Sequence, residues 1–152
     1  MSITIRPAAA DDLGTIVDFN AAMALETEHL VLDRAVLHAG VMAGLADLNK
    51  ARYFVAERAG EVVGQLMLTL EWSDWRNGWM WWIQSVYVRP EARRVGVFRA
   101  LYLHVETAAK EAGDVAGIRL YMERDNHRAE ATYLALGMER TPYVVLEQVP
   151  LQ

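Results

Sequence analysis

A long apolar stretch that leads into a basic loop constrains the fold of this chain more than any other feature. Residues 79–88, "WMWWIQSVYV", are apolar on both faces apart from Gln84 and Ser85, which is typical of a central strand covered on both sides. Pro90 cannot donate to a neighbouring strand, so strand pairing should stop there. From Val97 the apolar residues recur at helical spacing. The sequence therefore predicts a buried strand, a short loop and a helix in direct succession.

The helix after the loop is predicted from one apolar face and one terminating glycine. Five apolar residues fall at positions i, i+3, i+7, i+10 and i+14: Phe98, Leu101, Val105, Ala108 and Ala112. Gly113 follows as a natural helix end. We expect these five side chains, that of Phe98 included, to point into the core.

The rest of the chain alternates between strand and helix signals. Further strands are expected at residues 3–7, 52–58, 61–72, 118–122 and 143–149, and helices near residues 11–23, 32–47 and 126–137. The expected order is β-α-α-β-β-β-α-β-α-β-β. The fold class is α/β, with a mixed, mostly antiparallel sheet and helices on both faces. A chain of 152 residues fits one domain, residues 1–152.

Composition excludes several classes of protein. With 53% hydrophobic and 23% charged residues the chain is globular rather than disordered, and it has no cysteine for disulfides or thiolate sites. The net charge of −5 argues against nucleic acid as a partner. We find no signal peptide and no membrane-spanning stretch, so a cytoplasmic protein with no membrane contact is expected. The four histidines show no metal-ligand spacing, and no metal is expected.

The loop between the long strand and its helix gathers positive charge. Arg89, Arg93, Arg94 and Arg99 surround Gly96, which lets the backbone approach a ligand closely. The first N–H groups of a helix have no partner within it, so they attract anions such as a pyrophosphate. The alternative is a turn glycine among solvated arginines. One glycine is not a phosphate fingerprint, and both interpretations stay open on this stretch alone.

Two motifs in this order resemble the GNAT superfamily of acetyl-CoA-dependent N-acetyltransferases. The first is "VYVRPEARRVGVFRALY" at residues 86–102, and the second is "LYMERDNHRAEATYLALGM" at residues 120–138. The element order resembles the family from residue 3 to about residue 148. The resemblance implies a GNAT fold, acetyl-CoA as co-substrate and no metal.

The resemblance also implies a set of residues that bind coenzyme A. Backbone groups of the strand end would bind the pantetheine arm as an added strand: Val86, Tyr87 and Val88. N–H groups of the loop and helix start would hold the pyrophosphate: Arg94, Val95, Gly96, Val97, Phe98 and Arg99. Arg93 matches the family's Gln or Arg position, whereas Phe98 stands where the family usually has Gly or Ala. We therefore expect the Phe98 ring in the core and its N–H at the phosphate.

Two residues of the second motif are candidates for the reactive end of the cofactor. Asn126 and Tyr133 are seven residues apart, so on a helix they share one face about 10 Å apart. The resemblance implies that Asn126 contacts the coenzyme A arm and that Tyr133 protonates the departing thiolate. The alternative for Tyr133 is a core aromatic with its hydroxyl at the surface.

An attacking amine must lose a proton, which calls for a base on the acceptor side. Glu71, at the end of a strand, is the first candidate, and its alternative is a solvated strand end. Gln84 stands where many GNAT proteins carry an acid, and an amide cannot act as a base. Glu26 and Glu28, placed in a link between the first two helices, are candidate acceptor contacts or else an exposed loop pair. Trp72 could line an acceptor pocket, the core or a dimer contact.

The expected activity is transfer of an acetyl group from acetyl-CoA to a primary amine of a small molecule or peptide by direct attack, with Tyr133 as acid and Glu71 as base. The alternative is a non-catalytic acyl-CoA-binding sensor or structural module. A third interpretation, an interaction domain without coenzyme A, would require that acetyl-CoA leave thermal stability unchanged. The sequence does not identify the acceptor, and the final strands offer edges for a homodimer.

Overall fold

The computed structural model describes residues 2–151 and divides into two compact units, one ending at Leu120 and the other starting at Tyr121. The first unit contains, in chain order, β1 (Ile3–Pro7), α1 (Leu13–Glu28), α2 (Arg34–Ala46), β2 (Arg52–Arg58), β3 (Glu61–Ser73), β4 (Gly78–Val88), α3 (Val97–Ala112) and β5 (Val115–Leu120). Short 3-10 turns precede α1 (Ala10–Asp12) and α3 (Pro90–Ala92). The second unit contains α4 (His127–Ala135).

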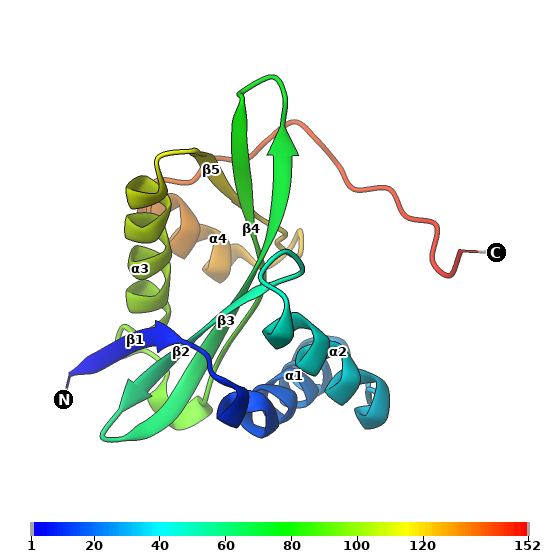
Figure 1. Ribbon diagram of the computed structural model, residues 1–152, viewed down its shortest axis with the longest axis vertical. Coiled ribbons are helices and arrows are strands. Elements are labelled where there is room, and N and C mark those ends of the chain that lie inside the picture. The colour runs from blue at the N-terminus through cyan, green and yellow to red at the C-terminus, as the bar shows by residue number, and fades with distance from the viewer. Residues whose placement is uncertain (1, 152) are drawn as a thin grey trace. The chain divides into compact units, whose positions relative to one another are not determined.

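The strands of the first unit form one mixed sheet in the order β1-β2-β3-β4-β5 (Figure 1). Pairing is antiparallel from β1 to β4 and parallel between β4 and β5. The expected α/β class and the central position of the long apolar strand are therefore confirmed. The β3–β4 hairpin extends past β5 at the top of Figure 1.

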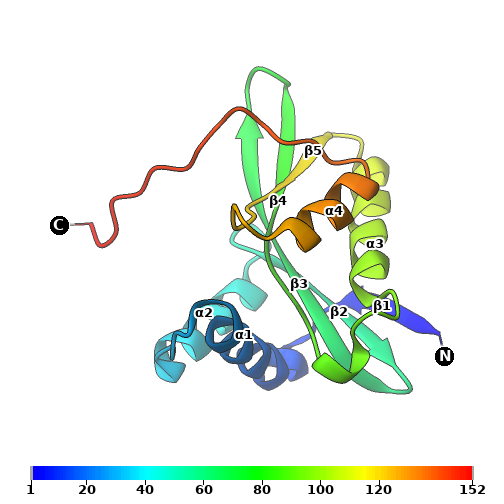
Figure 2. The ribbon, with the colours of Figure 1, turned by 180° about the vertical axis from the view of Figure 1, so that it is seen from behind.

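Helix α3 covers one face of the sheet, which we call the α3 face. The ring of His104 on α3 lies 5.3 Å from that of Phe54 on β2, and side chains that alternate with Phe54 share its face. The buried residues of α3 are Val97, Leu101, Tyr102, Val105 and Ala109. Figure 2 shows α3 alongside the sheet.

The predicted apolar face of α3 was displaced by one residue at its start. Val97 is 2% exposed, whereas Phe98 is only half-buried and Ala112 is exposed. Val97, Leu101 and Val105 follow an i, i+4, i+8 spacing, and the ridge that they form faces the sheet. The Phe98 ring was expected to be buried in the core, but it is only partly buried. Val97 is the residue of the first turn of α3 that is fully packed against the sheet.

Helices α1 and α2 cover the opposite face, which we call the α1 face. Val55 of β2 packs there with Ile16 and Val17 of α1 and Val41 of α2. α1 continues through Glu28, so the expected link at Glu26 and Glu28 was wrong: both are in the last helical turn. No glycine or proline lies between Thr15 and Glu28, and the Ala, Met, Leu and Glu residues of the last two turns favour helix.

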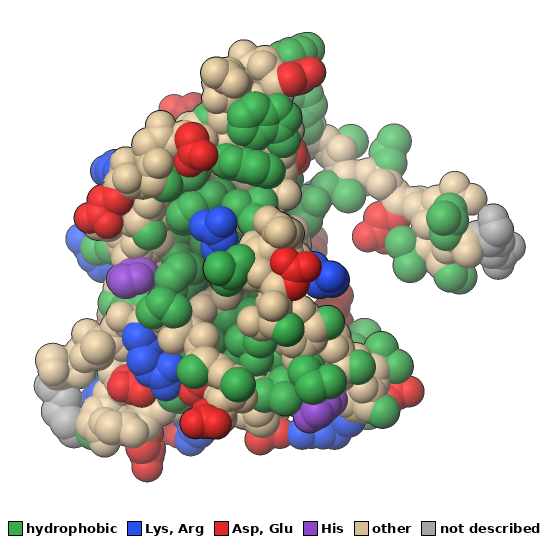
Figure 3. Space-filling model, in the orientation of Figure 1, with side chains coloured by type: hydrophobic (Ala, Val, Ile, Leu, Met, Phe, Trp, Pro, Cys, Tyr) green, Lys and Arg blue, Asp and Glu red, His purple; other side chains and the backbone are tan. Residues whose placement is uncertain are grey.

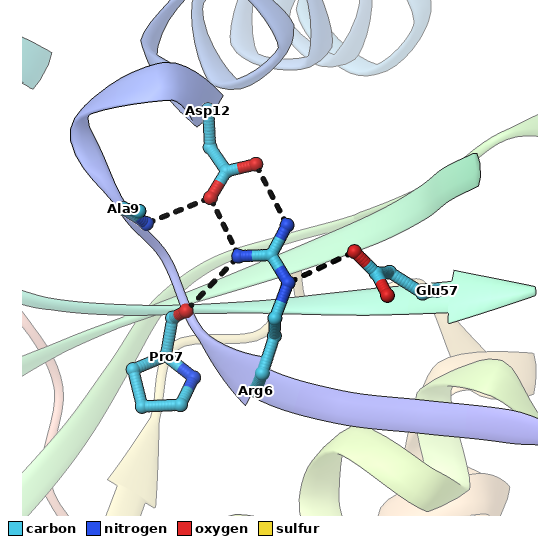
Figure 4. A network of polar contacts seen from close by, with 5 residues as sticks. All are labelled: Arg6, Pro7, Ala9, Asp12 and Glu57. Carbon is cyan, nitrogen blue, oxygen red and sulfur yellow. Dashed lines mark hydrogen bonds and ion pairs between the residues drawn. The ribbon is translucent and has the colours of Figure 1, made fainter. Parts of the chain in front are cut away.

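An ion-pair network fixes the start of α1 to the edge of the sheet (Figure 4). The guanidinium of Arg6 donates two hydrogen bonds to the Asp12 carboxylate, at 2.8 and 3.0 Å, and one to Glu57 at 2.9 Å. Asp12 also accepts the N–H of Ala9 at 2.7 Å. The Arg6 guanidinium lowers the pKa of Asp12 by hydrogen bonding to the carboxylate. The network therefore joins β1, β2 and α1.

The second unit departs from the sequence prediction in one respect. Its helix begins after Asn126, whose side chain caps it, as expected. The strand predicted at residues 143–149 is absent: from Tyr121 to Leu151 the structure contains one helix and no strand. A β-branched segment becomes a strand only beside another strand, and this unit supplies none. The strand predicted at residues 118–122 instead runs from Val115 to Leu120, in the first unit.

Candidate active site

The site begins where β4 and β5 part. The last pairing between them joins Ile83 to Leu120, so β4 continues through Val88 without β5 beside it. An irregularity at this point leaves Gln84 as an extra residue between two that pair with β3. A bulge of this kind bends a strand and ends regular pairing. In the first unit, the edge of β4 beyond Gln84 is therefore left without a neighbouring strand.

Main-chain groups on this edge alternate in direction. The N–H of Arg89 donates to the Val63 carbonyl on β3 at 2.8 Å, so Tyr87, two residues earlier, also points its main-chain groups toward β3. Val86 and Val88 then point theirs toward the open edge. The Arg93 side chain confirms this direction, because its Nε donates to the Val88 carbonyl at 2.8 Å. The open edge therefore presents the N–H groups of Val86 and Val88.

The loop after β4 turns sharply into α3. Arg94 and Gly96 both have left-handed backbones, with φ values of 65° and 91°. No atom lies within 4 Å of a Cβ built on Gly96, so backbone conformation rather than space favours glycine there. The carbonyl of Gly96 accepts the Ala100 N–H at 3.0 Å, and no side chain of residues 2–151 caps the helix start. By helix geometry, the N–H groups of Val97 and Arg99 in the first turn of α3 therefore have no acceptor within the helix.

A second glycine brings α3 close to the sheet. A Cβ on Gly64 of β3 would lie 3.0 Å from the Tyr87 carbonyl and 3.1 Å from a methyl group of Val97. Only glycine gives room for this approach without a shift of the neighbours. Gly64 therefore places the first turn of α3 directly beside the end of β4.

One arginine of the loop is held by its own chain. Arg93 donates to Val88 and to a Glu26 carboxylate oxygen, the latter at 2.8 Å, and its guanidinium lies 5.4 Å from the Tyr87 ring centre. The Tyr87 hydroxyl donates to Glu26 at 3.5 Å, and its ring packs on Phe19 at 5.0 Å. Burial, with a smaller contribution from Glu26, raises the pKa of Tyr87. Arg93 and Glu26 thus fasten the loop to α1.

The other arginines of the loop differ in how far their side chains contact the rest of the chain. Arg89 stacks on Phe19 at 5.4 Å and lies 4.0 Å from the Glu91 carboxylate. Arg94 and Arg99 are exposed, on either side of Gly96. These two arginines therefore place positive charge beside the α3 N–H groups. An anion of the size of a pyrophosphate fits this set of donors.

A cluster of polar contacts joins β3, β4 and β5 on the α1 face, close to the point where β4 and β5 separate. Glu71 of β3 accepts the indole N–H of Trp82 on β4 at 2.9 Å and a guanidinium hydrogen of Arg119 on β5 at 3.1 Å. The Arg119 guanidinium also lies 5.8 Å from the Trp82 ring centre. Both oxygens of the predicted base Glu71 therefore accept hydrogen bonds. Sequence reasoning missed Arg119; the alternation of β5 and its register with Trp82 were the signals that could have located it.

Further polar residues continue along the same face. Gln84 donates to the Thr69 hydroxyl at 2.8 Å, and Gln65 donates to the Ser85 hydroxyl at 3.3 Å. The predicted pocket residue Trp72 does not join them. It lies one position from Glu71 on β3, so it points to the α3 face, where its ring contacts that of Trp79 at 5.0 Å. Figure 3 shows hydrophobic side chains on this hairpin at the top of the molecule.

The second unit positions Asn126 and Tyr133 on one helix. The Asn126 side-chain oxygen accepts the Ala129 N–H at 3.2 Å, so it caps α4 and leaves its amide group as a donor. Tyr133 is half-buried, and burial raises the pKa of its hydroxyl. A tyrosine with a raised pKa is protonated at neutral pH and can act as an acid.

Two kinds of feature are absent between residues 2 and 151. No group of three or more His, Cys, Asp or Glu side chains there could hold a metal ion. No helix in that range is long and apolar enough to cross a membrane.

The model of the Acetyltransferase (GNAT) family matches residues 21–138, which include the strand separation, the basic loop, α3 and α4. The chain belongs to the GNAT acetyltransferase family. A GNAT protein of this kind is an acyltransferase that uses acetyl-CoA as co-substrate. No curated protein matches the chain.

Solved structures agree with the GNAT assignment. A possible acetyltransferase from Clostridium difficile 630 is 44% identical, with a TM-score of 0.92 and all of both chains covered. An integron cassette protein from the Cole Harbour Salt Marsh metagenome has a TM-score of 0.84 at 22% identity, over 97% of this chain and 91% of its own. The aminoglycoside acetyltransferase AAC(6')-Iy, in complex with a CoA-containing bisubstrate analog, has a TM-score of 0.80 at 17% identity, over 99% of this chain and 100% of its own. The last two share the fold.

Proposed function

We propose that this GNAT protein is an N-acetyltransferase that transfers the acetyl group of acetyl-CoA to a primary amine. The observation that carries the proposal is the open edge of β4 beside the uncapped start of α3, with left-handed backbones at Arg94 and Gly96. An extended pantetheine arm needs main-chain partners, and a pyrophosphate needs N–H donors and positive charge. Along the chain, the main-chain groups of the β4 edge are followed by the N–H donors of the loop and helix start. The pantetheine arm and the pyrophosphate are likewise consecutive parts of coenzyme A.

The chain's groups divide between the parts of coenzyme A. The main-chain groups of Val86 and Val88 would pair with the pantetheine amides, while Tyr87 supports the edge through its pairing with β3. The loop and helix N–H groups would bind the pyrophosphate: Arg94, Val95, Gly96, Val97, Phe98 and Arg99. Asn126 would donate its amide hydrogens to the arm. Arg93 has a positioning role, because its side chain already binds Val88 and Glu26.

The transfer can be balanced with residues of this chain. The amine nitrogen forms a bond to the acetyl carbon while the carbon–sulfur bond breaks. The Tyr133 hydroxyl gives its proton to the departing thiolate, and Glu71, the proposed base, receives the amine proton. Glu71 is 45% exposed by its side chain and thus reachable by an acceptor. Gln84, Glu26 and Glu28 are proposed contacts of that acceptor.

A non-catalytic acyl-CoA-binding module is the second candidate. The observation that favours it is the pairing of Glu71 with both Arg119 and Trp82, since a carboxylate held by two donors within the chain can serve a purely structural role. Such a module would bind acetyl-CoA without turnover. It would also be indifferent to changes at Glu71 and Tyr133.

We also propose that the protein is a homodimer, because its C-terminal segment exposes apolar side chains. Six large apolar side chains there are at least 60% exposed: Tyr143, Val144, Val145, Leu146, Val149 and Leu151. Side chains exposed to this degree in one segment indicate a partner surface, and a strand-forming segment can pair with the sheet edge of a second copy. Light scattering of the full chain and of a chain ending at residue 142 would compare their masses. A monomeric full chain would contradict this part of the proposal.

The activity is tested by the release of coenzyme A in the presence of amines of several classes. The chain has no cysteine, so a thiol reagent reads coenzyme A alone. Tyr133→Phe should lower kcat by about 100-fold or more because the thiolate loses its proton donor, while the Kd for acetyl-CoA stays within about twofold. Tyr143→Phe, an exposed tyrosine of the same unit, is the matched control. Tight acetyl-CoA binding without turnover of any amine would reject the enzyme and support the binding module.

A further inference from the structure

Carboxylates that are proposed to contact the acceptor already form ion pairs with arginines of this chain. Glu71 is paired with Arg119 at 3.1 Å, and Glu26 is paired with Arg93 at 2.8 Å. These are two of the three carboxylates proposed to contact the acceptor. The net charge of −5 is therefore not concentrated where the acceptor binds. An acceptor with several positive charges would have to displace arginines from their partners.

The Glu71–Arg119 pair also lies close to where acyl transfer would occur. Arg119 is opposite Trp82 in the parallel pairing, one position before the last pair of β4 and β5. Two residues along a strand span about 7 Å, so the pair lies about that far from Gln84, where the strands part. Glu71 and Arg119 side chains are 45% and 25% exposed. An acceptor can thus reach both charges at once.

We propose that the acceptor is an amine that carries its own carboxylate, as an α-amino acid does. This inference rests on the proposed N-acetyltransferase activity. The carboxylate of the acceptor would pair with Arg119, and its ammonium group would pair with Glu71 before giving up a proton to it. The separation of the two charges in an α-amino acid is close to the 3.1 Å between Arg119 and Glu71. An amino acid that lies alongside the pair gives each of the two charges a second partner of opposite sign, and none is left unpaired.

Trp82 contacts both members of the Glu71–Arg119 pair and holds them in place. Its indole N–H holds one Glu71 oxygen at 2.9 Å, and its ring faces the Arg119 guanidinium at 5.8 Å. The indole therefore fixes the direction of both charged groups. A bound amino acid would meet two oriented charges rather than two mobile side chains, which lowers the entropic cost of binding.

The test compares amines that differ by one carboxylate. The acceptor pairs are L-phenylalanine with phenethylamine, L-tryptophan with tryptamine and L-lysine with cadaverine, and the other common amino acids and spermidine complete the panel. We expect at least one amino acid to be acetylated, with a kcat/KM about 10- to 100-fold above that of its matched amine, the range of one charge-assisted hydrogen bond.

Arg119→Gln should remove that preference. It should lower the ratio of kcat/KM between the amino acid and its matched amine about 10- to 100-fold, chiefly through the KM for the amino acid, while Arg119→Lys should restore part of the ratio. Arg58→Gln is the matched control, because Arg58 lies opposite Glu61 in the β2–β3 strand register, at the far end of β3, ten residues and about 33 Å from Glu71. Thermal melting shows whether Arg119→Gln folds. If it does not fold, the acceptor preference of Arg119→Lys is the test.

Two outcomes would overturn the inference. If matched amines or spermidine are acetylated as well as, or better than, every amino acid, the carboxylate has no partner, and the N-acetyltransferase activity itself stands. If acetyl-CoA binds and nothing in the panel is acetylated, the proposed activity fails together with this inference.

Discussion

The two faces of the sheet differ in what they bury. On the α3 face, Leu66 and Leu68 of β3 are fully buried, and Leu101 of α3 is equally inaccessible. On the α1 face, Gln65 is also fully buried, but its one side-chain oxygen has no hydrogen-bond partner among the described residues. Neighbouring positions on one strand thus enter an apolar core on one side and a face that also buries polar groups on the other.

The difference shows how one sheet can provide both stability and a binding surface. The α3 face contributes apolar burial, which is the main favourable term in folding. The α1 face gives up part of that burial for polar groups: Gln65, Thr69, Glu71, Gln84 and Arg119. Buried polar groups without partners cost stability, so we expect the α1 face to be the less stabilising of the two.

The largest effect is expected on the α3 face. Leu101→Ala should lower the free energy of unfolding by about 2 to 5 kcal/mol, because a fully buried leucine leaves a cavity. Urea denaturation measures the change. Leu103→Ala, on the same helix but 37% exposed, is the control and should cost far less. Equal losses for the two variants would remove the basis for treating α3 as the core helix.

An intermediate effect is expected at the Arg6–Asp12 ion pair. Asp12→Asn should cost about 2 kcal/mol, because the mostly buried Asp12 carboxylate accepts two charge-assisted hydrogen bonds from Arg6 that the amide cannot replace. The folded pKa of Asp12 is lowered, so its contribution is present above the unfolded pKa of about 4 and is lost as pH falls through the folded value. Denaturation between pH 7 and pH 2 should therefore show the wild type and variant converging in acid.

Glu71→Gln is the matched comparison for that ion pair on the same face. Its pair with Arg119 is more exposed, so stability should change by less than about 1 kcal/mol. A cost equal to that of Asp12→Asn would indicate that Glu71 is mainly structural.

The smallest effect is expected at Gln65 and has the opposite sign. Gln65→Met keeps the side-chain length and removes an unpartnered buried oxygen, so the protein should become more stable by up to about 1 kcal/mol. Thermal melting and urea denaturation measure it. A loss of more than about 1 kcal/mol would show that the hydrogen bond to Ser85 outweighs the unpartnered oxygen.

Local sequence patterns predicted most of the fold. β2 was predicted at its observed bounds because turn residues flank an apolar run, and Gly113 ended α3 as expected, with φ of 82°. The strand predicted at residues 143–149 failed because strand formation depends on a neighbour that no local pattern reveals. Phe98 failed because periodicity does not distinguish adjacent apolar residues at a helix start.

The backbone of the candidate site could be predicted from the sequence better than the partners of its charged side chains. Gly96 and the arginines indicated a loop that presents N–H groups, and the structure gives that loop left-handed turns. The partners of Glu71 and Glu26 were not predictable, because Arg119 and Arg93 reach them from positions 48 and 67 residues away. Such pairs follow from sheet register and helix packing, which a single sequence does not show.

The central claim is that coenzyme A binds along the open edge of β4 and the start of α3. Backbone amide NMR during a titration with coenzyme A tests it most directly. The account predicts large shifts for Val86, Val88 and the first turn of α3 after Gly96, with little change at Leu66 and Leu68 in the covered strand beside them. Binding of coenzyme A that leaves the Val86, Val88 and α3 amides unmoved would contradict it.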